Sequence, residues 1–196
     1  VSPTAFIRIL GAGAGHASGG TVSNAGDVNG DGISDVLIGA RTATSTPGRT
    51  TAGISYVIFG STTVVDIDLA TIETGSVQGF RVLGAKAEDR SGQALSGAGD
   101  INGDGLSDIV VGVPFFDRST VSTDSGAVFV IFGRPDATDV DLRLFNVTTP
   151  LGFRLLGVPT VNAYTGFSVS SAGDFNHDGY GDIIIGARQA SGAGRV

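Results

Sequence analysis

The chain has 196 residues, 41% of them hydrophobic, which is enough for one globular domain with a buried core. Its 32 glycines disfavour long helices and supply many turns, so we expect an all-β protein of short strands. The formal net charge of −7 argues against nucleic acid as a partner, and the absence of cysteine excludes disulfides and thiolate zinc sites. No apolar stretch approaches the roughly 20 residues needed to cross a bilayer, so no direct membrane insertion is expected.

Short runs rich in Val, Ile and Phe, bounded by Gly, Asp or Asn, predict strands joined by turns. The first run is 6–10, inside the segment 5–11. In the middle of the chain, four runs follow one another at 92–98, 108–112, 126–132 and 152–156. Runs such as VFVIF are apolar on both faces, which predicts sheets stacked between neighbouring sheets.

These runs recur along the chain. The segments GDVNGDGISDVLIGA, GDINGDGLSDIVVGV and GDFNHDGYGDIIIGA begin at residues 26, 99 and 173, at spacings of 73 and 74 residues. GISYVIFG and GAVFVIFG begin at 53 and 126, and GFRVLGA and GFRLLGV at 79 and 152. Four antiparallel strands per period predict one blade of a β-propeller. We therefore expect one propeller segment over 1–196, with repeats at about 18–84, 91–157 and 165–196, the last incomplete.

Each period contains an acidic loop of the form D-x-N-x-D-G-x-x-D, and the three loops hold nine of the 19 acidic residues. Oxygen-bearing side chains at positions 1, 3, 5 and 9, with Gly at position 6 for the sharp turn, suit calcium, which accepts six to eight oxygens. A backbone carbonyl at position 7 completes each set. The predicted ligands are Asp27, Asn29, Asp31, Ile33 and Asp35; Asp100, Asn102, Asp104, Leu106 and Asp108; and Asp174, Asn176, Asp178, Tyr180 and Asp182.

Three other interpretations of these loops are weaker. An EF-hand needs a bidentate Glu at position 12, where this chain has Ile38, Val111 and Ile185. Magnesium prefers near-ideal octahedral geometry and keeps its waters. A metal-free Asx turn leaves three like charges unneutralised in each loop. We therefore predict about three Ca²⁺ per chain, which would bring the formal charge of −7 to −1.

With these residues in view, the chain resembles the FG-GAP repeats of integrin α-subunit propellers and of many secreted bacterial proteins. FG stands at 59–60 and 132–133, and GA or GVP at 39–40, 112–114 and 186–187. The stretches STTVVDIDLATIETGSVQ and RPDATDVDLRLFNVTTPL are more similar to bacterial members, which favours a microbial source. A sequon at Asn146 has meaning only in a host that glycosylates secreted proteins.

The resemblance implies that the face opposite the acidic loops binds a protein or glycan ligand. The large side chains on the loops expected there are Arg41, Arg90, Phe115, Phe116, Arg118 and Tyr164. Aromatic residues and Arg dominate binding hot spots. The alternative for each is that it packs under its own loop or is solvated.

Counting strands gives about three blades, whereas propellers typically have four to eight. An open fan exposes strand edges. We therefore expect further blades, either from the same parent chain or from a second copy, with 5–11 acting as a strand of a preceding or closing blade.

No constellation in the sequence predicts catalysis. His16 and His177 have no repeat counterparts of their own type, and carboxylates shared by calcium stay ionised, which a glycosidase acid cannot do. The expected function is a calcium-binding, non-catalytic binding module for cell adhesion or surface assembly. The alternative is an accessory or scaffold propeller domain of a larger secreted enzyme. Extracellular modules bind calcium at roughly 10⁻⁴ to 10⁻³ M, so a secreted, cell-surface or periplasmic location is expected.

Overall fold

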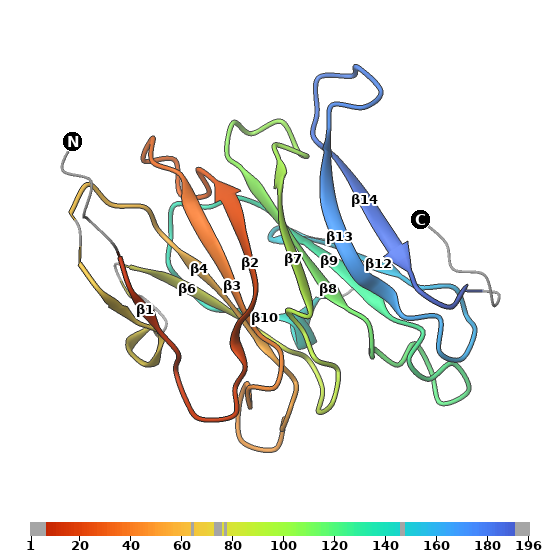
Figure 1. Ribbon diagram of the computed structural model, residues 1–196. Coiled ribbons are helices and arrows are strands. Elements are labelled where there is room, and N and C mark those ends of the chain that lie inside the picture. Colours follow the sequence, from red (N-terminus) through yellow and green to blue (C-terminus); the bar gives the residue numbers. More distant parts are fainter. Residues whose placement is uncertain (1–6, 64, 73–75, 77, 146–147, 191–196) are drawn as a thin grey trace.

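The computed structural model describes residues 7–63, 65–72, 76, 78–145 and 148–190. Twisted antiparallel sheets stand side by side along the chain, as Figure 1 shows. The predicted all-β fold, with four-stranded antiparallel propeller blades forming part of a ring, is confirmed. The sequon at Asn146 and the segment 191–196 lie outside the described residues, as does the beginning of the predicted strand 6–10.

Two blades have four described antiparallel strands each, in the predicted order. Strands pair with their neighbours in sequence because each connection is a turn or loop that reverses the chain. The first blade consists of β2 (Ser18–Gly26), β3 (Asp35–Ala40), β4 (Ile54–Ile58) and β6 (Gly79–Leu83). The second consists of β7 (Ala94–Gly99), β8 (Asp108–Val113), β9 (Ala127–Ile131) and β12 (Gly152–Leu156), with β11 (Thr148–Thr149) beside β12. In the third, β13 (Thr165–Gly173) pairs with β14 (Asp182–Ala187).

One feature of the blades was not predicted from the sequence. After its third strand, each of the first two repeats sends a segment back to the fourth strand of the preceding blade. We call the segments 66–72 and 139–145 the straps. Each strap contains a short strand and a 3-10 turn, namely β5 (Ile67–Asp68) with η1 (Leu69–Thr71), and β10 (Val140–Asp141) with η2 (Leu142–Leu144). β5 pairs in parallel with β1 (Ile9–Leu10), and β10 pairs in parallel with β6.

The core lies between the blades rather than inside any one of them. Alternate residues of a strand point to opposite faces, and here both faces are buried. In β8, Ile109 and Val111 belong to the cluster shared with the first blade, whereas Val110 packs towards β13 and β14 of the third. All five residues of β4 and of β9 are buried, as the apolar runs predict. Stacking of blades is therefore what removes these strands from water.

Candidate metal centres

The acidic loops connect the first strand of each blade to its second. They occupy 27–34, 100–107 and 174–181, and Figure 1 shows all three at the same end of the blades, in orange, green and blue. Because the blades repeat, their acidic loops lie in a row along a single edge of the molecule (Figure 1). All fifteen residues predicted as ligands lie in these loops or at the first residue of the strand that follows.

Each loop is held in shape by hydrogen bonds from its own backbone. In the first loop, Asp27 Oδ1 accepts the N–H of Gly30 at 2.8 Å, and its Oδ2 accepts the N–H of Gly32 at 2.9 Å. Asn29 Nδ2 donates to Asp31 Oδ2 at 2.9 Å. The same amide-to-carboxylate bond joins Asn102 to Asp104 and Asn176 to Asp178. Three loops of different surroundings thus adopt one conformation, because the repeated side chains make the same local bonds.

In the first two loops, the aspartate at position 9 differs from the other loop aspartates because it is buried. Asp35 and Asp108 are both 0% exposed and begin the second strands of their blades. Each accepts two backbone N–H groups, one from loop position 2 and one from the glycine of the FG pair. The donors are Val28 (2.8 Å) and Gly60 (2.7 Å) for Asp35, and Ile101 (2.7 Å) and Gly133 (2.8 Å) for Asp108. Position 9 therefore ties the acidic loop to the end of the third strand.

The surroundings of Asp108 disfavour its charge. Burial raises the pKa of Asp108 to about 6, although the N–H donors of Gly133 and Ile101 pull that pKa down. The neighbouring carboxylates of Asp104 and Asp100 raise it further. A cation in this loop would reverse the balance, because an opposite charge nearby favours the ionised carboxylate.

Consecutive loops are joined to one another across the blade boundary. The carbonyl of Asp27 accepts the N–H of Ser107 at 2.9 Å, and the carbonyl of Asp100 accepts the N–H of Gly181 at 2.8 Å. The side chain of Leu106 lies so close to Gly30 that a Cβ there would meet it at 2.9 Å. The loops thus form a connected row, and ordering one of them restrains the next.

The donor set of each loop fits a hard cation. Positions 1, 5 and 9 offer carboxylates, position 3 offers an amide oxygen and position 7 a backbone carbonyl, which are the oxygen ligands that calcium prefers. In the described part of the chain, no three acidic or histidine side chains gather closely enough to hold a metal ion. The carboxylates are hydrogen-bonded to loop backbone instead: Asp27 Oδ1 accepts the N–H groups of Gly30 and Asp31, and Asp27 Oδ2 accepts the N–H of Gly32.

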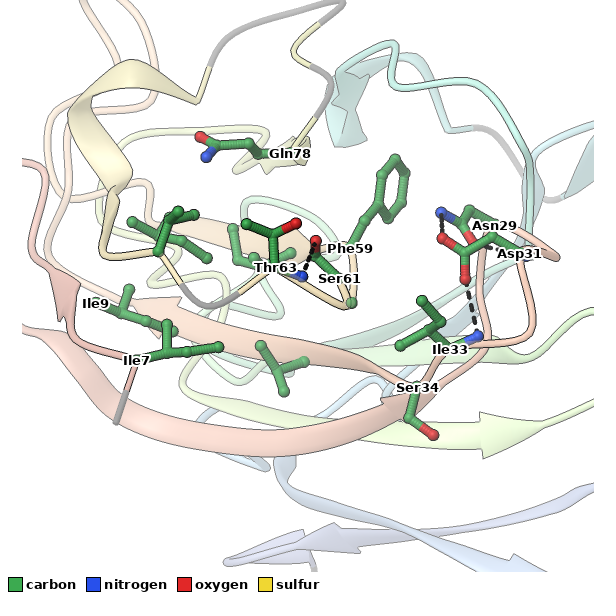
Figure 2. Close-up of a pocket in the computed structure, with 15 residues that line it drawn as sticks. Ile7, Ile9, Asn29, Asp31, Ile33, Ser34, Phe59, Ser61, Thr63 and Gln78 are labelled. Atoms are coloured by element: carbon green, nitrogen blue, oxygen red, sulfur yellow. Dashed lines mark hydrogen bonds between the residues drawn. The ribbon is translucent and has the colours of Figure 1, made fainter. Parts of the chain in front are cut away.

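A pocket of about 480 Å³ opens beside the first acidic loop. Figure 2 shows Asn29 and Asp31 on one side of it and Ile7 and Ile9, next to the first strap, on the other. Most of its lining is apolar, and Ile7 is 47% exposed. The pocket therefore belongs to the uncovered face of the first blade and offers no constellation for chemistry.

At the opposite edge, several candidate ligand contacts pack against one another. Phe115 and Tyr164 meet edge to face at 5.4 Å between ring centroids, and the guanidinium of Arg90 lies 4.6 Å from the centre of the Phe115 ring. Phe116 packs on the core against Phe129. Phe116 therefore packs in the core, as the alternative to ligand binding expects. Arg90, Phe115 and Tyr164 instead form an aromatic and cationic group that bridges two blades.

Near this group lies a buried carboxylate whose pKa is strongly raised. Asp89 is 1% exposed, its Oδ2 has no hydrogen-bond partner among the described residues, and burial raises its pKa to about 7. The charge of Lys86 lowers this pKa, whereas Asp117 and Asp124 raise it.

Because the folded state holds the Asp89 proton more tightly than the unfolded state, the stability from this group is present at low pH and is lost as pH rises from about 4 to about 7. Asp89→Asn keeps the shape without the charge. We expect the variant to match the parent protein at pH 4 and to exceed its free energy of unfolding at pH 8 by about 2 to 4 kcal/mol. Urea unfolding of both proteins in identical buffers measures this difference, and equal stabilities at pH 8 would contradict it.

Comparison with known proteins agrees with the geometry. The model of the FG-GAP repeat family matches residues 18–58, 91–131 and 165–196, more than half of the chain. The chain therefore belongs to the FG-GAP repeat family, whose repeats form propeller blades.

Relatives cover most of this chain but share only a small part of their own length with it. The bovine phosphatidylinositol-glycan-specific phospholipase D is 30% identical over 184 residues, which are 90% of this chain and 19% of that protein. The integrin alpha pat-2 of Caenorhabditis briggsae is 30% identical over 181 residues, 89% of this chain and 13% of that protein. Human integrin alpha-8 is 29% identical over 178 residues, 87% of this chain and 14% of that protein. Over the residues that the structure describes, no helix has the length and apolar character of a membrane span.

Proposed function

We propose that the three acidic loops bind calcium, one ion each, and that the ions stiffen the row of loops at one edge of the propeller. The observation that supports this most is the repetition of one oxygen-donor set in one hydrogen-bonded conformation at the same edge of three blades. Asp27, Asn29, Asp31, Asp35 and the carbonyl of Ile33 would hold the first ion, and the corresponding residues of the other loops the other two. The bound ions would neutralise like charges that otherwise repel one another.

Calcium is then expected to stabilise the folded chain. At calcium concentrations about ten times the Kd, each site adds about 1.4 kcal/mol, so three sites raise the Tm by about 10 °C relative to chelator. Asp31→Asn, Asp104→Asn and Asp178→Asn should each remove about a third of this rise, as followed by thermal unfolding with and without calcium. Glu88→Gln, which removes an exposed charge away from the loops, is the matched control and should keep the full rise.

We further propose that the chain is a non-catalytic binding module that presents the opposite edge to a protein or glycan partner, in adhesion or surface assembly outside the cell. The group of Arg90, Phe115 and Tyr164 supports this, because rigid aromatic rings with an Arg are typical of binding hot spots. The similarity to integrin alpha chains also supports a binding role. Binding to an array of glycans and matrix proteins, lost in Tyr164→Ala and kept in Glu88→Gln, is the expected result. Binding that Tyr164→Ala leaves intact would contradict the assignment of this edge.

A second candidate function rests on the phospholipase relatives. The bovine phospholipase matches 90% of this chain. This match supports an accessory role, in which the propeller is a scaffold for the catalytic domain of a larger secreted enzyme. In that case too the present residues do no chemistry. Incubation of the chain with membranes carrying a glycosylphosphatidylinositol-anchored protein should release none of it, and release above buffer level would overturn the non-catalytic assignment.

A further inference from the structure

The two straps bind the blade before them through the same pair of charges. Arg81 Nε donates to Asp139 Oδ2 at 3.0 Å, and the Arg81 backbone N–H donates to Asp139 Oδ1 at 2.9 Å. In the preceding copy, Arg8 makes the same two bonds to Asp66, at 2.9 Å from Nε and 3.1 Å from the backbone. The arginine is the third residue of the fourth strand's G-F-R motif at 79–81, or its equivalent at residue 8.

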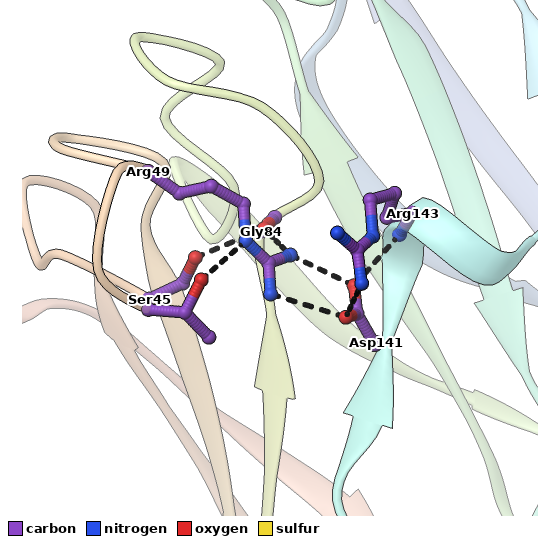
Figure 3. A network of polar contacts seen from close by, with 6 residues as sticks. Ser45, Arg49, Gly84, Asp141 and Arg143 are labelled. Carbon is purple, nitrogen blue, oxygen red and sulfur yellow. Dashed lines mark hydrogen bonds and ion pairs between the residues drawn. The ribbon is translucent and has the colours of Figure 1, made fainter.

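A second arginine holds the second carboxylate of the strap. Arg49 Nη1 donates to Asp141 Oδ1 at 2.8 Å and to the carbonyl of Gly84 at 2.8 Å, while its Nη2 donates to Asp141 Oδ2 at 3.1 Å (Figure 3). Burial raises the pKa of Asp141, but the bonds from Arg49 and the Arg143 N–H outweigh this and hold that pKa below its usual range. The two aspartates of the Asp-Val-Asp sequence in the strap 139–145 therefore each bind an arginine of the first blade, because alternate residues of a strand point the same way.

The second blade carries both arginines, and neither has an acidic partner among the residues that the structure describes. Arg154 follows Gly152 and Phe153 as Arg81 follows Gly79 and Phe80, yet its buried Nε has no hydrogen-bond partner among the described residues. Arg118 Nη1 donates to the carbonyl of Gly157 at 2.9 Å, as Arg49 does to Gly84. Within the described chain, neither Arg118 nor Arg154 forms an ion pair.

Apolar side chains at the end of the same strand are partly exposed in the described part of the chain. On β6, Val82 is 0% exposed, in one cluster with Val140 and Leu142 of the strap. On β12, Leu155 lies at the position that Val82 has on β6, and Leu155 and the next residue, Leu156, are both 39% exposed. Covering such side chains removes apolar surface from water and favours binding of a strand with alternating acidic and aliphatic residues.

We infer that the edge of β12, with Arg118 and Arg154, is a docking site for an extended Asp-Xaa-Asp-Leu segment of a further FG-GAP repeat, where Xaa is Val or Ile. The first aspartate pairs with Arg154 and the second with Arg118, while the two aliphatic residues cover Leu155 and Leu156. Two copies of this arrangement within the molecule supply the register: the aliphatic residue between the aspartates lies opposite the residue after the arginine. The assignment does not depend on calcium.

The probe is a peptide with the sequence of residues 137–145, ATDVDLRLF, titrated into the isotope-labelled chain. We expect saturable binding at one site, with a shift of the Arg154 Nε–H signal in NMR spectra. Replacing both aspartates of the peptide by Asn should weaken binding about tenfold or more, since charge-assisted hydrogen bonds are lost. Arg154→Gln and Arg118→Gln should each weaken binding of the native peptide about tenfold. Neither variant should change the affinity for the Asn peptide much.

Arg41→Gln is the matched control, because Arg41 is exposed on a neighbouring loop and should leave the Kd unchanged. Circular dichroism and unfolding curves establish that the Gln variants remain folded. The inference is overturned by the absence of saturable binding at millimolar peptide, or by equal affinities for the acidic and Asn peptides. It is likewise overturned if sedimentation shows a dimer of this chain that Arg154→Gln dissociates, since the occupant would then be a second copy.

Discussion

Replacing Asp108 by alanine is expected to lower the free energy of unfolding by about 4 kcal/mol in the absence of calcium. The carboxylate is 0% exposed and accepts the N–H groups of Gly133 and Ile101 at 2.8 and 2.7 Å. Its removal leaves a buried donor at Gly133 and a partly buried one at Ile101 unpaired, at about 1 to 3 kcal/mol each. Urea unfolding in chelator measures the loss.

Asp104→Ala is the control for this prediction. Asp104 lies in the same loop and carries the same charge, but it is exposed and water can replace its bonds. We expect it to cost less than about 1 kcal/mol without calcium. Equal losses for the two variants would show that position 9 has no structural role beyond its charge.

The second large effect is expected at Gly126, where two blades touch. Gly126 has a φ of 79°, and a Cβ there would lie 2.2 Å from the carbonyl oxygen of Thr165 in the third blade. Gly126→Ala therefore combines a left-handed backbone with a collision, and we expect a loss of about 3 to 4 kcal/mol. Chemical unfolding monitored by circular dichroism measures it.

The variant Gly48→Ala separates the effect of the left-handed backbone from that of the collision. The φ of Gly48 is 84°, but no atom of the described residues lies within 4 Å of a Cβ added there. Gly48→Ala should therefore show the backbone term alone, about 1 kcal/mol. If Gly126→Ala costs no more than Gly48→Ala, the close approach of the blades at Thr165 is not what fixes glycine at this position.

The blades and their order could be predicted because each strand carries its own local signals. Runs such as AVFVI at 127–131 are short, β-branched and flanked by Gly, and the 73-residue period repeats them in one order. The acidic loops could be placed for the same reason, since their shape depends on side chains inside the loop, as the Asn29–Asp31 bond shows.

The straps could not be predicted in this way. β10 is two residues long, and what fixes it is the contact of Asp139 with Arg81, 58 residues away, and of Asp141 with Arg49, 92 residues away. Local propensity says little about such pairs. The repeated D-I-D-L and D-V-D-L at 66–69 and 139–142 were the available signal, and together with the repeated arginine they could have indicated the contact.

The roles of exposed loops were also only partly predictable. Large side chains on an exposed loop are typical of binding hot spots, so the sequence alone predicts candidate ligand contacts at Phe116 and Arg118. Phe116 instead packs on Phe129, and Arg118 holds the carbonyl of Gly157. Both contacts join residues that are distant in the sequence and meet only when the strands of the blade pair, so sequence spacing does not reveal them.

The most direct test of calcium binding at the acidic loops is a calorimetric titration of calcium into chelator-stripped chain, analysed for the number of sites. We expect three sites per chain, with one site lost in each of Asp31→Ala, Asp104→Ala and Asp178→Ala, because each residue belongs to a different loop. Folded protein that takes up no calcium at millimolar concentration would contradict it and leave the acidic loops as turns held by their own hydrogen bonds.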